Sequence, residues 1–251
     1  MKYIPIVAAI LTAAAPAYAA GNGPATTPVP PIKHSAAANS SSGSSGGSAT
    51  TGSAANENQN NSAQQLVAHA VKVVKTMESD QKLAGLMKKA KGLFIVPDFG
   101  RGAFVVGGRG GAGLVTVREN RKWSDPAFYD IGGVSLGAQV GGSGGPVAFL
   151  LMDQSAVDAF KSGNKFSLNT GAGLSIVDYS ANSQASWGKG DIIMWSNTAG
   201  AYVGATVSVT DINWSDTNNR GYYGKKTDMT QILNGSVSNA NASELTSALP
   251  G

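Results

Sequence analysis

The sequence contains no cysteine, so neither disulfide bonds nor thiolate metal sites are available to this protein. It has only two histidines, His34 and His69. There are therefore too few histidines to favour a histidine-based catalytic triad or a histidine-ligated zinc site. We accordingly expect no enzyme and no metal or other cofactor.

Charged residues are also scarce, at 14% of the chain, against about 25% in an average globular protein. Glycine is abundant instead, with 33 of the 251 residues. This combination favours a β-rich fold with many turns over a helical bundle. The net charge of +4 suits an anionic surface as a partner. Aromatic residues are too scattered, and basic residues too few, for a nucleic-acid platform.

The apolar run at the N-terminus, Ile4 to Ala15, is too short to span a bilayer. Lys2 precedes this run and the small-residue triplet Ala17-Tyr18-Ala19 follows it. The three features together are typical of a secretory signal peptide, which we assign to residues 1–20. We therefore expect a cleaved, periplasmic or secreted protein that can lie peripherally on a membrane.

The segment that follows, residues 21–62, is rich in serine, glycine, proline and asparagine and poor in large apolar residues. Such a segment cannot bury enough apolar surface to offset its ordering entropy, so it is predicted to be a disordered tether. The remaining residues, 63–251, are long enough for one folded domain with a single core.

Two helices are expected at the start of this domain. Apolar residues recur at helical spacing from about Ala63 to Glu78, and Ser62 with Gln65 fits a capping box at the beginning of that helix. The second helix, from about Asp80 to Lys91, is predicted to end at Gly92.

Beyond Gly92 the apolar spacing changes from a helical period to a period of two, which indicates strands. Three segments carry branched apolar residues on one face and glycine or other small residues on the other: residues 132–141, 167–176 and 200–210. A strand face made of glycine indicates that another backbone or a ligand approaches closely. We favour close packing, because it explains several strands at once.

Shorter elements complete the expected fold. Strands are predicted over residues 147–152 and 191–195, a hairpin over 213–223, and short helices over 155–161, 227–233 and 243–249, the first of them capped by Ser155. The sum is an α+β fold. It is β-rich, with a twisted antiparallel sheet or partial barrel of glycine-rich strands, two N-terminal helices and short peripheral helices.

Two motifs match the residue pattern of known ligand-binding loops but not the other features that those loops require. Residues 108–113 (GRGGAG) fit the glycine pattern of dinucleotide-binding loops, but the apolar segment 114–117 that follows reads as a strand. That site needs a helix there, whose N-terminal amides meet the pyrophosphate. The loop 216–221 resembles the start of a calcium loop, yet arginine occupies a ligand position. We interpret it as a plain turn.

Basic residues gather on both sides of Gly92; they are Lys82, Lys88, Lys89, Lys91, Arg101 and Arg109. One interpretation is a solvated helix face whose cations suit the negative end of the helix dipole. The other is a patch that faces an anionic surface, where each cation contributes on the order of 1 kcal/mol. The two differ in whether these side chains converge in space.

Several segments of the domain match ordered motifs at consistent spacing. They are residues 89–97 (KAKGLFIVP), 107–114 (GGRGGAGL), 123–128 (WSDPAF), 133–141 (GVSLGAQVG), 152–160 (MDQSAVDAF) and 219–225 (NRGYYGK). Together they resemble the SYLF domain, a lipid-binding family with a yeast actin-patch member and many secreted bacterial members. The resemblance covers nearly all of residues 63–251.

The resemblance implies a non-enzymatic module that binds acidic phospholipids through basic residues, aided by an amphipathic N-terminal helix. Phosphoinositides, the ligands of eukaryotic members, are not expected in a bacterial envelope, so another anionic phospholipid is the expected partner. Because a signal peptide and a tether precede the domain, the helix over 63–78 would have to supply the apolar contact. The alternative is an envelope structural or protein-interaction module that binds a protein partner without lipid dependence.

Overall fold

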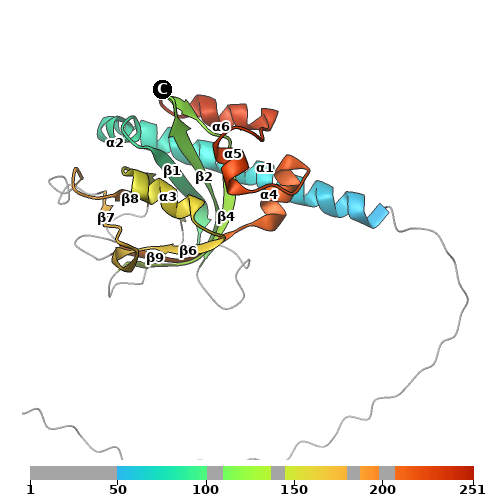
Figure 1. Ribbon diagram of the computed structural model, residues 1–251. Helices are drawn as coiled ribbons and strands as arrows, with labels where there is room; N and C mark the ends of the chain where they lie inside the picture. The colour runs from blue at the N-terminus through green and yellow to red at the C-terminus, as the bar shows by residue number, and fades with distance from the viewer. Residues whose placement is uncertain (1–49, 101–109, 137–144, 180–186, 198–206) are drawn as a thin grey trace, which may run out of the picture. The chain divides into compact units, whose positions relative to one another are not determined.

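The computed structural model describes residues 50–100, 110–136, 145–179, 187–197 and 207–251 (Figure 1). The predicted signal peptide and most of the predicted tether lie outside the described residues. So do Arg101 and Arg109, the segment 137–141 and the segment 200–206.

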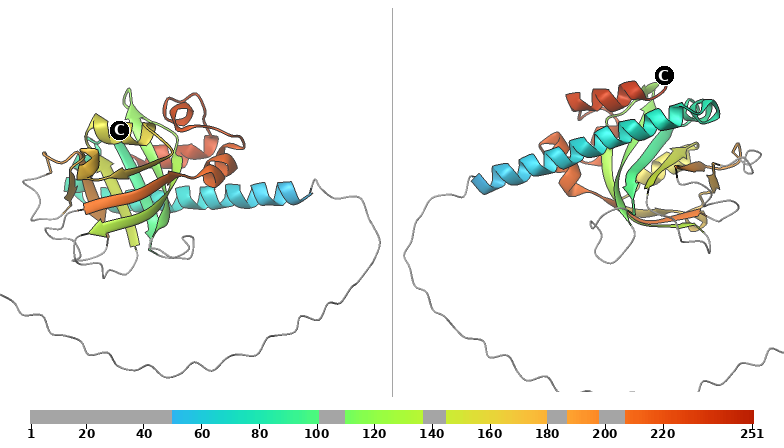
Figure 2. Two further views of the ribbon diagram at one scale, coloured as in Figure 1. Left: turned by 60° about the horizontal axis from the view of Figure 1, so that its bottom comes forward. Right: turned by 180° about the vertical axis from the view of Figure 1, so that it is seen from behind.

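A nine-stranded sheet forms the centre of the described domain, with the strands in the order β6-β9-β4-β2-β1-β5-β8-β7 and β3 paired with β2. The strands are β1 (Gly92–Phe99), β2 (Gly111–Glu119), β3 (Lys122–Trp123), β4 (Ala127–Leu136), β5 (Gly145–Leu151), β6 (Lys165–Leu168), β7 (Ile176–Asp178), β8 (Ile192–Ser196) and β9 (Val207–Trp214). All pairs are antiparallel except β7 with β8, which is parallel. The sheet curls strongly, so that β6 and β9 run across the direction of β1 and β2 (Figures 1 and 2).

Helices cover both faces of this sheet. They are α1 (Thr50–Glu78), α2 (Gln81–Met87), α3 (Gln154–Lys161), α4 (Asp216–Tyr223), α5 (Met229–Leu233) and α6 (Ser243–Ala248), with 3₁₀ turns at Thr170–Ala172 and Ala240–Ala242. The long α1 crosses the back of the sheet, with α6 alongside it (Figure 2, right). The expected α+β fold with a curled, partly closed sheet is confirmed.

The apolar side chains separate into two cores, one on each face of the sheet. In β1, Leu93 and Ile95 belong to the core beneath α1 and α2. Phe94 and Val96 belong to the opposite core, which also holds apolar residues of α3 and α5. A strand buried on both faces reads as a continuous apolar run rather than an alternating one, and residues 93–96 (LFIV) have that pattern.

Glycines stand where neighbouring atoms come very close. A Cβ added to Gly113 in β2 would lie 2.8 Å from the carbonyl oxygen of Ile95 and 2.8 Å from the ring of Phe94. One added to Gly132 in β4 would lie 2.6 Å from the Cβ of Asp211. Close packing rather than a ligand therefore accounts for these two positions. The strand that begins at Gly111 continues through Leu114, which confirms that no helix follows the glycine motif.

The two N-terminal helices differ from their expected bounds. α1 begins at Thr50, and Ser62 is not its cap: its hydroxyl donates to the carbonyl of Asn58, 3.0 Å away, inside the helix. α2 ends at Met87, so Gly92 does not terminate it. Gly92 instead opens β1, where an added Cβ would lie 3.0 Å from the side chain of Leu151. Tertiary packing, which single-sequence signals do not contain, explains the last of these errors.

Two predicted strand segments were wrong. Residues 167–176 do not form one strand, because the side chain of Asn169 accepts the Ala172 amide at 2.9 Å and starts a 3₁₀ turn after β6. The predicted hairpin over 213–223 is instead the end of β9 followed by α4, which ends at Gly224 with φ at 66°. α3 is capped by Asp153 rather than Ser155.

Gly221 in α4 is predicted to be intolerant of even one added methyl group. In Gly221→Ala that methyl carbon would lie 2.7 Å from the backbone carbon of Gln59 in α1 and 2.9 Å from the amide nitrogen of Asn60. Overpacking of this kind costs about 1–3 kcal/mol. The free energy of unfolding, measured by chemical denaturation, should fall accordingly.

Gly85→Ala is the matched control, because Gly85 lies in α2 with nothing within 4 Å of an added Cβ. Alanine favours a helix over glycine by about 0.5–1 kcal/mol, so this variant should be more stable than the parent. Stabilisation by both substitutions would contradict the close contact of α4 with α1.

Candidate functional site

Three of the predicted site lysines lie on or just after α2 and point away from the core. Asp80 caps the helix by accepting the amides of Lys82 and Leu83 at 2.9 and 3.2 Å. The buried face of this segment holds Leu83, Met87 and Ala90. Lys82, Lys88 and Lys89 are consequently exposed.

Lys91 lies between α2 and β1, with its backbone fixed by the sheet and its side chain exposed. Its amide donates to the carbonyl of Leu151 at 2.8 Å, and its carbonyl accepts the amide of Arg118 at 2.7 Å. The pKa of Asp153 is lowered, first by hydrogen bonds from Ser155 and further by the charge of Lys91. Lys91 therefore also interacts with the residue that caps α3.

Two exposed lysines of α1, Lys72 and Lys75, belong to the same part of the chain and were missed by sequence reasoning. The sequence held a signal for them, since Lys72 stands between the apolar residues Val71 and Val73, and Lys75 between Val74 and Met77. We define the lysine surface as Lys72, Lys75, Lys82, Lys88, Lys89 and Lys91. From residue 72 to 91 these six lysines face two carboxylates, a net charge of 6 − 2 = +4.

The lysine surface is not neutralised by ion pairs within the described residues. The pairs found there are His69 with Asp98, Lys161 with Glu119, and Lys165 with Asp211. None of them includes a lysine of this surface. The surface therefore keeps its positive charge available to an external anion, except where Asp80 and Asp153 lie near Lys82 and Lys91.

Arg118 holds the turn that carries Lys88 in place. One of its guanidinium nitrogens donates to the carbonyl of Lys88 at 2.6 Å and the other to the carbonyl of Pro250. The guanidinium lies 4.6 Å from the centre of the Trp123 ring, and the Trp123 indole donates to the same Pro250 carbonyl at 2.9 Å. The lysine turn, the β2–β3 hairpin and the C-terminus are thus joined by one side chain. Sequence reasoning did not single out Arg118.

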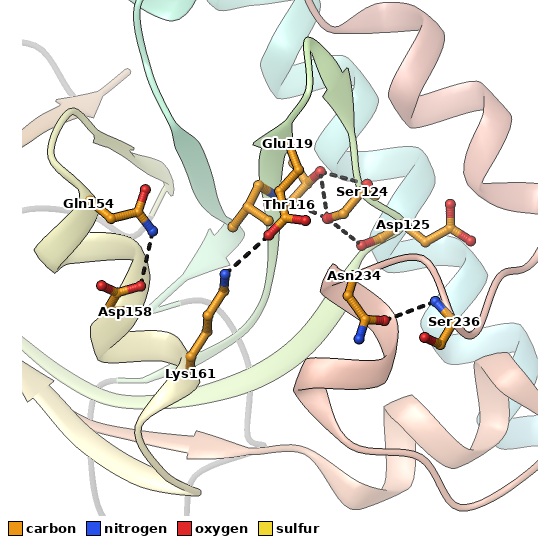
Figure 3. A network of polar contacts seen from close by, with 10 residues as sticks. Thr116, Glu119, Ser124, Asp125, Gln154, Asp158, Lys161, Asn234 and Ser236 are labelled. Carbon is orange, nitrogen blue, oxygen red and sulfur yellow. Dashed lines mark hydrogen bonds and ion pairs between the residues drawn. The ribbon is translucent and has the colours of Figure 1, made fainter.

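The motif over residues 123–128 has a structural role (Figure 3). The Thr116 hydroxyl donates to the Ser124 carbonyl at 2.7 Å, and the Ser124 hydroxyl accepts the Val117 amide at 3.0 Å. Asp125 accepts the Asn239 amide at 2.6 Å, while burial raises the pKa of its carboxyl. Ser124 and Asp125 therefore join backbone segments rather than form a nucleophile and a base.

The motif over residues 219–225 completes this junction. The buried Asn219 accepts the Phe128 amide at 3.0 Å and donates to the Phe128 carbonyl at 2.8 Å. The Tyr223 hydroxyl donates to the carbonyl of Pro126 at 2.8 Å. These contacts attach α4 to the start of β4, which makes the two motifs a shared structural element.

The described residues contain a small pocket but no cluster of metal-ligating side chains. No group of three or more histidine or carboxylate side chains that could hold a metal ion occurs there. A pocket of about 270 Å³ is lined mainly by residues of α1, α4 and α6 and contains one carboxylate, Glu244. Among the helices that the structure describes, none is both long and apolar enough to cross a bilayer.

Comparison with known proteins supports the SYLF resemblance at the level of a domain. The family model described as "Ysc84: Las17-binding protein actin regulator" matches residues 132–250, slightly less than half of the chain. The matched segment starts within β4 and includes the motif over 219–225, whereas the lysine surface lies before it.

Yeast proteins are similar to a larger part of the chain at low identity. LAS seventeen-binding protein 3 of Saccharomyces cerevisiae is 28% identical over 182 residues, which is 70% of this chain and 39% of that protein. Protein YSC84 of the same species has the same identity and coverage. The SH3 domain-containing protein PJ696.02 of Schizosaccharomyces pombe is 25% identical over 165 residues, which is 63% of this chain and 38% of that protein. The chain thus spans about two fifths of the length of these relatives.

Asn219→Ala should lower the free energy of unfolding, because it removes the acceptor of the buried Phe128 amide. An unpaired buried donor costs about 1–3 kcal/mol. Asn218→Ala is the neighbouring control: Asn218 is half-buried and loses a single bond, from its side-chain nitrogen to the Ser215 hydroxyl at 3.2 Å. Denaturant titrations that give equal losses for the two variants would refute the proposed role of Asn219.

Proposed function

We propose that this protein is a non-enzymatic module that binds an anionic phospholipid surface through the lysine surface. The observation that carries the proposal is the set of six exposed lysines without an ion-pair partner among the described residues. Lys82, Lys88 and Lys89 stand on or directly after α2, whose two ends are fixed by the Asp80 cap and by Arg118. A rigid arrangement favours simultaneous contact with several headgroups.

The expected strength of binding follows from the number of cations. Each lysine near an anionic membrane is worth on the order of 1 kcal/mol, so four to six acting together would give reversible attachment. One or two would not hold a domain of this size. Attachment of this kind weakens with salt, because the screening length falls from about 10 Å at 0.1 M to about 3 Å at 1 M ionic strength.

The apolar face of α1 does not supply the membrane contact that the resemblance implies. Its stripe of Val67, Val71, Val74 and Met77 is buried against the sheet. Insertion of this face would expose the core beneath it, so the proposal relies on the lysines for attachment. The motif similarity to a lipid-binding family supports the proposed ligand class. The predicted signal peptide supports an envelope membrane as its location.

A second candidate function is binding of a protein partner. It is favoured by the names of the yeast relatives, one of which is described as a LAS seventeen-binding protein. For this chain the corresponding proposal is an interaction module of the cell envelope without lipid dependence. Binding to purified vesicles in the absence of any other protein separates the two candidates.

The full chain without its predicted signal peptide should sediment with vesicles that contain phosphatidylglycerol and not with pure phosphatidylcholine vesicles. Binding should decline as sodium chloride is raised from about 0.1 M to 1 M, since the attraction is screened. Equal sedimentation with both vesicle types, or none with either, would rule out the electrostatic proposal. The second outcome would favour the protein-partner candidate.

Charge reversal at the lysine turn should weaken binding more than the same change elsewhere. Lys88→Glu with Lys89→Glu removes two cations, a loss of about 2 kcal/mol or roughly 30-fold in binding constant, before added repulsion is counted. The measurement is vesicle sedimentation over a range of lipid concentrations.

Lys225→Glu with Lys226→Glu is the matched control. It lowers the net charge of +4 by the same four units and changes two exposed lysines that follow α4. α4 contacts α1 near Gln59, whereas α2 follows the other end of α1 at Glu78 (Figure 2). Those points are roughly 29 Å apart at the rise of an α-helix. Equal weakening by both double variants would show that net charge, not the lysine surface, governs binding.

A further inference from the structure

A stacked aromatic pair lies beside the helix that carries the lysines. The rings of Tyr179 and Trp187 are 4.7 Å apart between centroids and inclined by 19°. The Tyr179 hydroxyl donates to the carboxylate of Asp80 at 2.8 Å, and Asp80 caps α2 two residues before Lys82. The pair is therefore joined by one hydrogen bond to the start of the lysine helix.

The placement of the strands agrees with this contact. Tyr179 directly follows β7, and its amide donates to the carbonyl of Met194 in β8 at 2.7 Å. β7, β8 and α2 lie at the same side of the domain in both the front and the back view (Figures 1 and 2). The aromatic pair and the lysine surface thus belong to one side of the domain.

Both aromatic rings are only partly covered. Tyr179 and Trp187 are half-buried and pack on the outside of the core beneath α1 and α2. Two further apolar residues are partly buried near lysines: Leu86 lies in α2, and Met152 follows Leu151, whose carbonyl accepts the amide of Lys91. Partly exposed apolar side chains therefore accompany the cations at α2 and at the start of β1.

The indole nitrogen of Trp187 adds a polar feature to the pair. It is buried and donates no hydrogen bond to any partner within the described residues. This nitrogen is not at the surface, but the partly exposed ring suits the boundary between lipid headgroups and acyl chains, where tryptophan side chains gather. The lysines beside it match the charge of an acidic lipid surface.

We propose that Tyr179 and Trp187 form the apolar anchor of the membrane-binding surface and enter the headgroup region of an acidic bilayer. The inference rests on the proposed function and gives the apolar contact to this pair instead of α1. The Asp80 bond orients Tyr179, so that docking of the lysines on lipid phosphates brings the aromatic pair to the bilayer.

The test uses the full chain bound to phosphatidylglycerol vesicles whose acyl chains are brominated near the headgroup. Bromine quenches tryptophan fluorescence only at short range. The expected result is quenching and a shift of emission to shorter wavelength on binding, both lost for the most part in Trp187→Phe. Trp214→Phe is the control, because Trp214 lies at the end of β9 and packs edge-on against Tyr129; this variant should keep the response.

Sedimentation of the same samples separates failure of the anchor from failure of the proposed function. Protein that sediments with the brominated vesicles but shows no quenching overturns the anchor and leaves lipid binding intact. Quenching that persists unchanged in Trp187→Phe also overturns it. Absence of sedimentation overturns the proposed function itself. Because the parent protein already gives the first result, the test does not depend on the folding of a variant.

Discussion

Burial of the central strands on both faces is the constraint on which the rest of the structure depends. In β1, Leu93 and Ile95 need the cover of α1 and α2, whereas Phe94 and Val96 need the residues of the opposite core. Neither set of helices can be absent without exposing half of the strand to water. The long α1 therefore commits its apolar stripe to the sheet, and its lysines are left on the outside.

Close packing of the layers depends on small residues at the contacts. Gly113 allows β2 to lie close to the Ile95 carbonyl and the Phe94 ring of β1, and Gly221 allows α4 to contact α1. Asn219 then fixes α4 by bonding both backbone groups of Phe128. The motifs that resemble the SYLF family are thus explained, where they are described, by the way in which the sheet and the helices join.

The proposed membrane contact uses the side chains that this packing leaves exposed. Once the stripe of α1 is buried, the exposed features of α2 and its neighbours are cations and partly covered apolar side chains. Arg118 and Asp80 fix the two ends of α2 through backbone contacts, at Lys88 and at Lys82. Charge supplies reversible attraction and the aromatic pair supplies apolar contact, a division of roles common at membrane interfaces.

The sequence alone determined the features that depend on local patterns. The change of apolar period after Gly92 predicted the passage from helices to a sheet. The strand-like segment after Gly113 excluded a dinucleotide-binding loop. The cluster of lysines around α2 could be recognised from the positions of the lysines in the sequence. The bounds of the N-terminal helices were mispredicted, and so were the segment 167–176, where Asn169 starts a 3₁₀ turn, and the helix at 216–223, where Asn219 and Gly221 meet distant partners. Tertiary structure alone decided that Arg118 holds the turn at Lys88 and that Tyr179 meets Asp80. Residues 118 and 88, or 179 and 80, are far apart along the chain, and only the curled sheet brings them together.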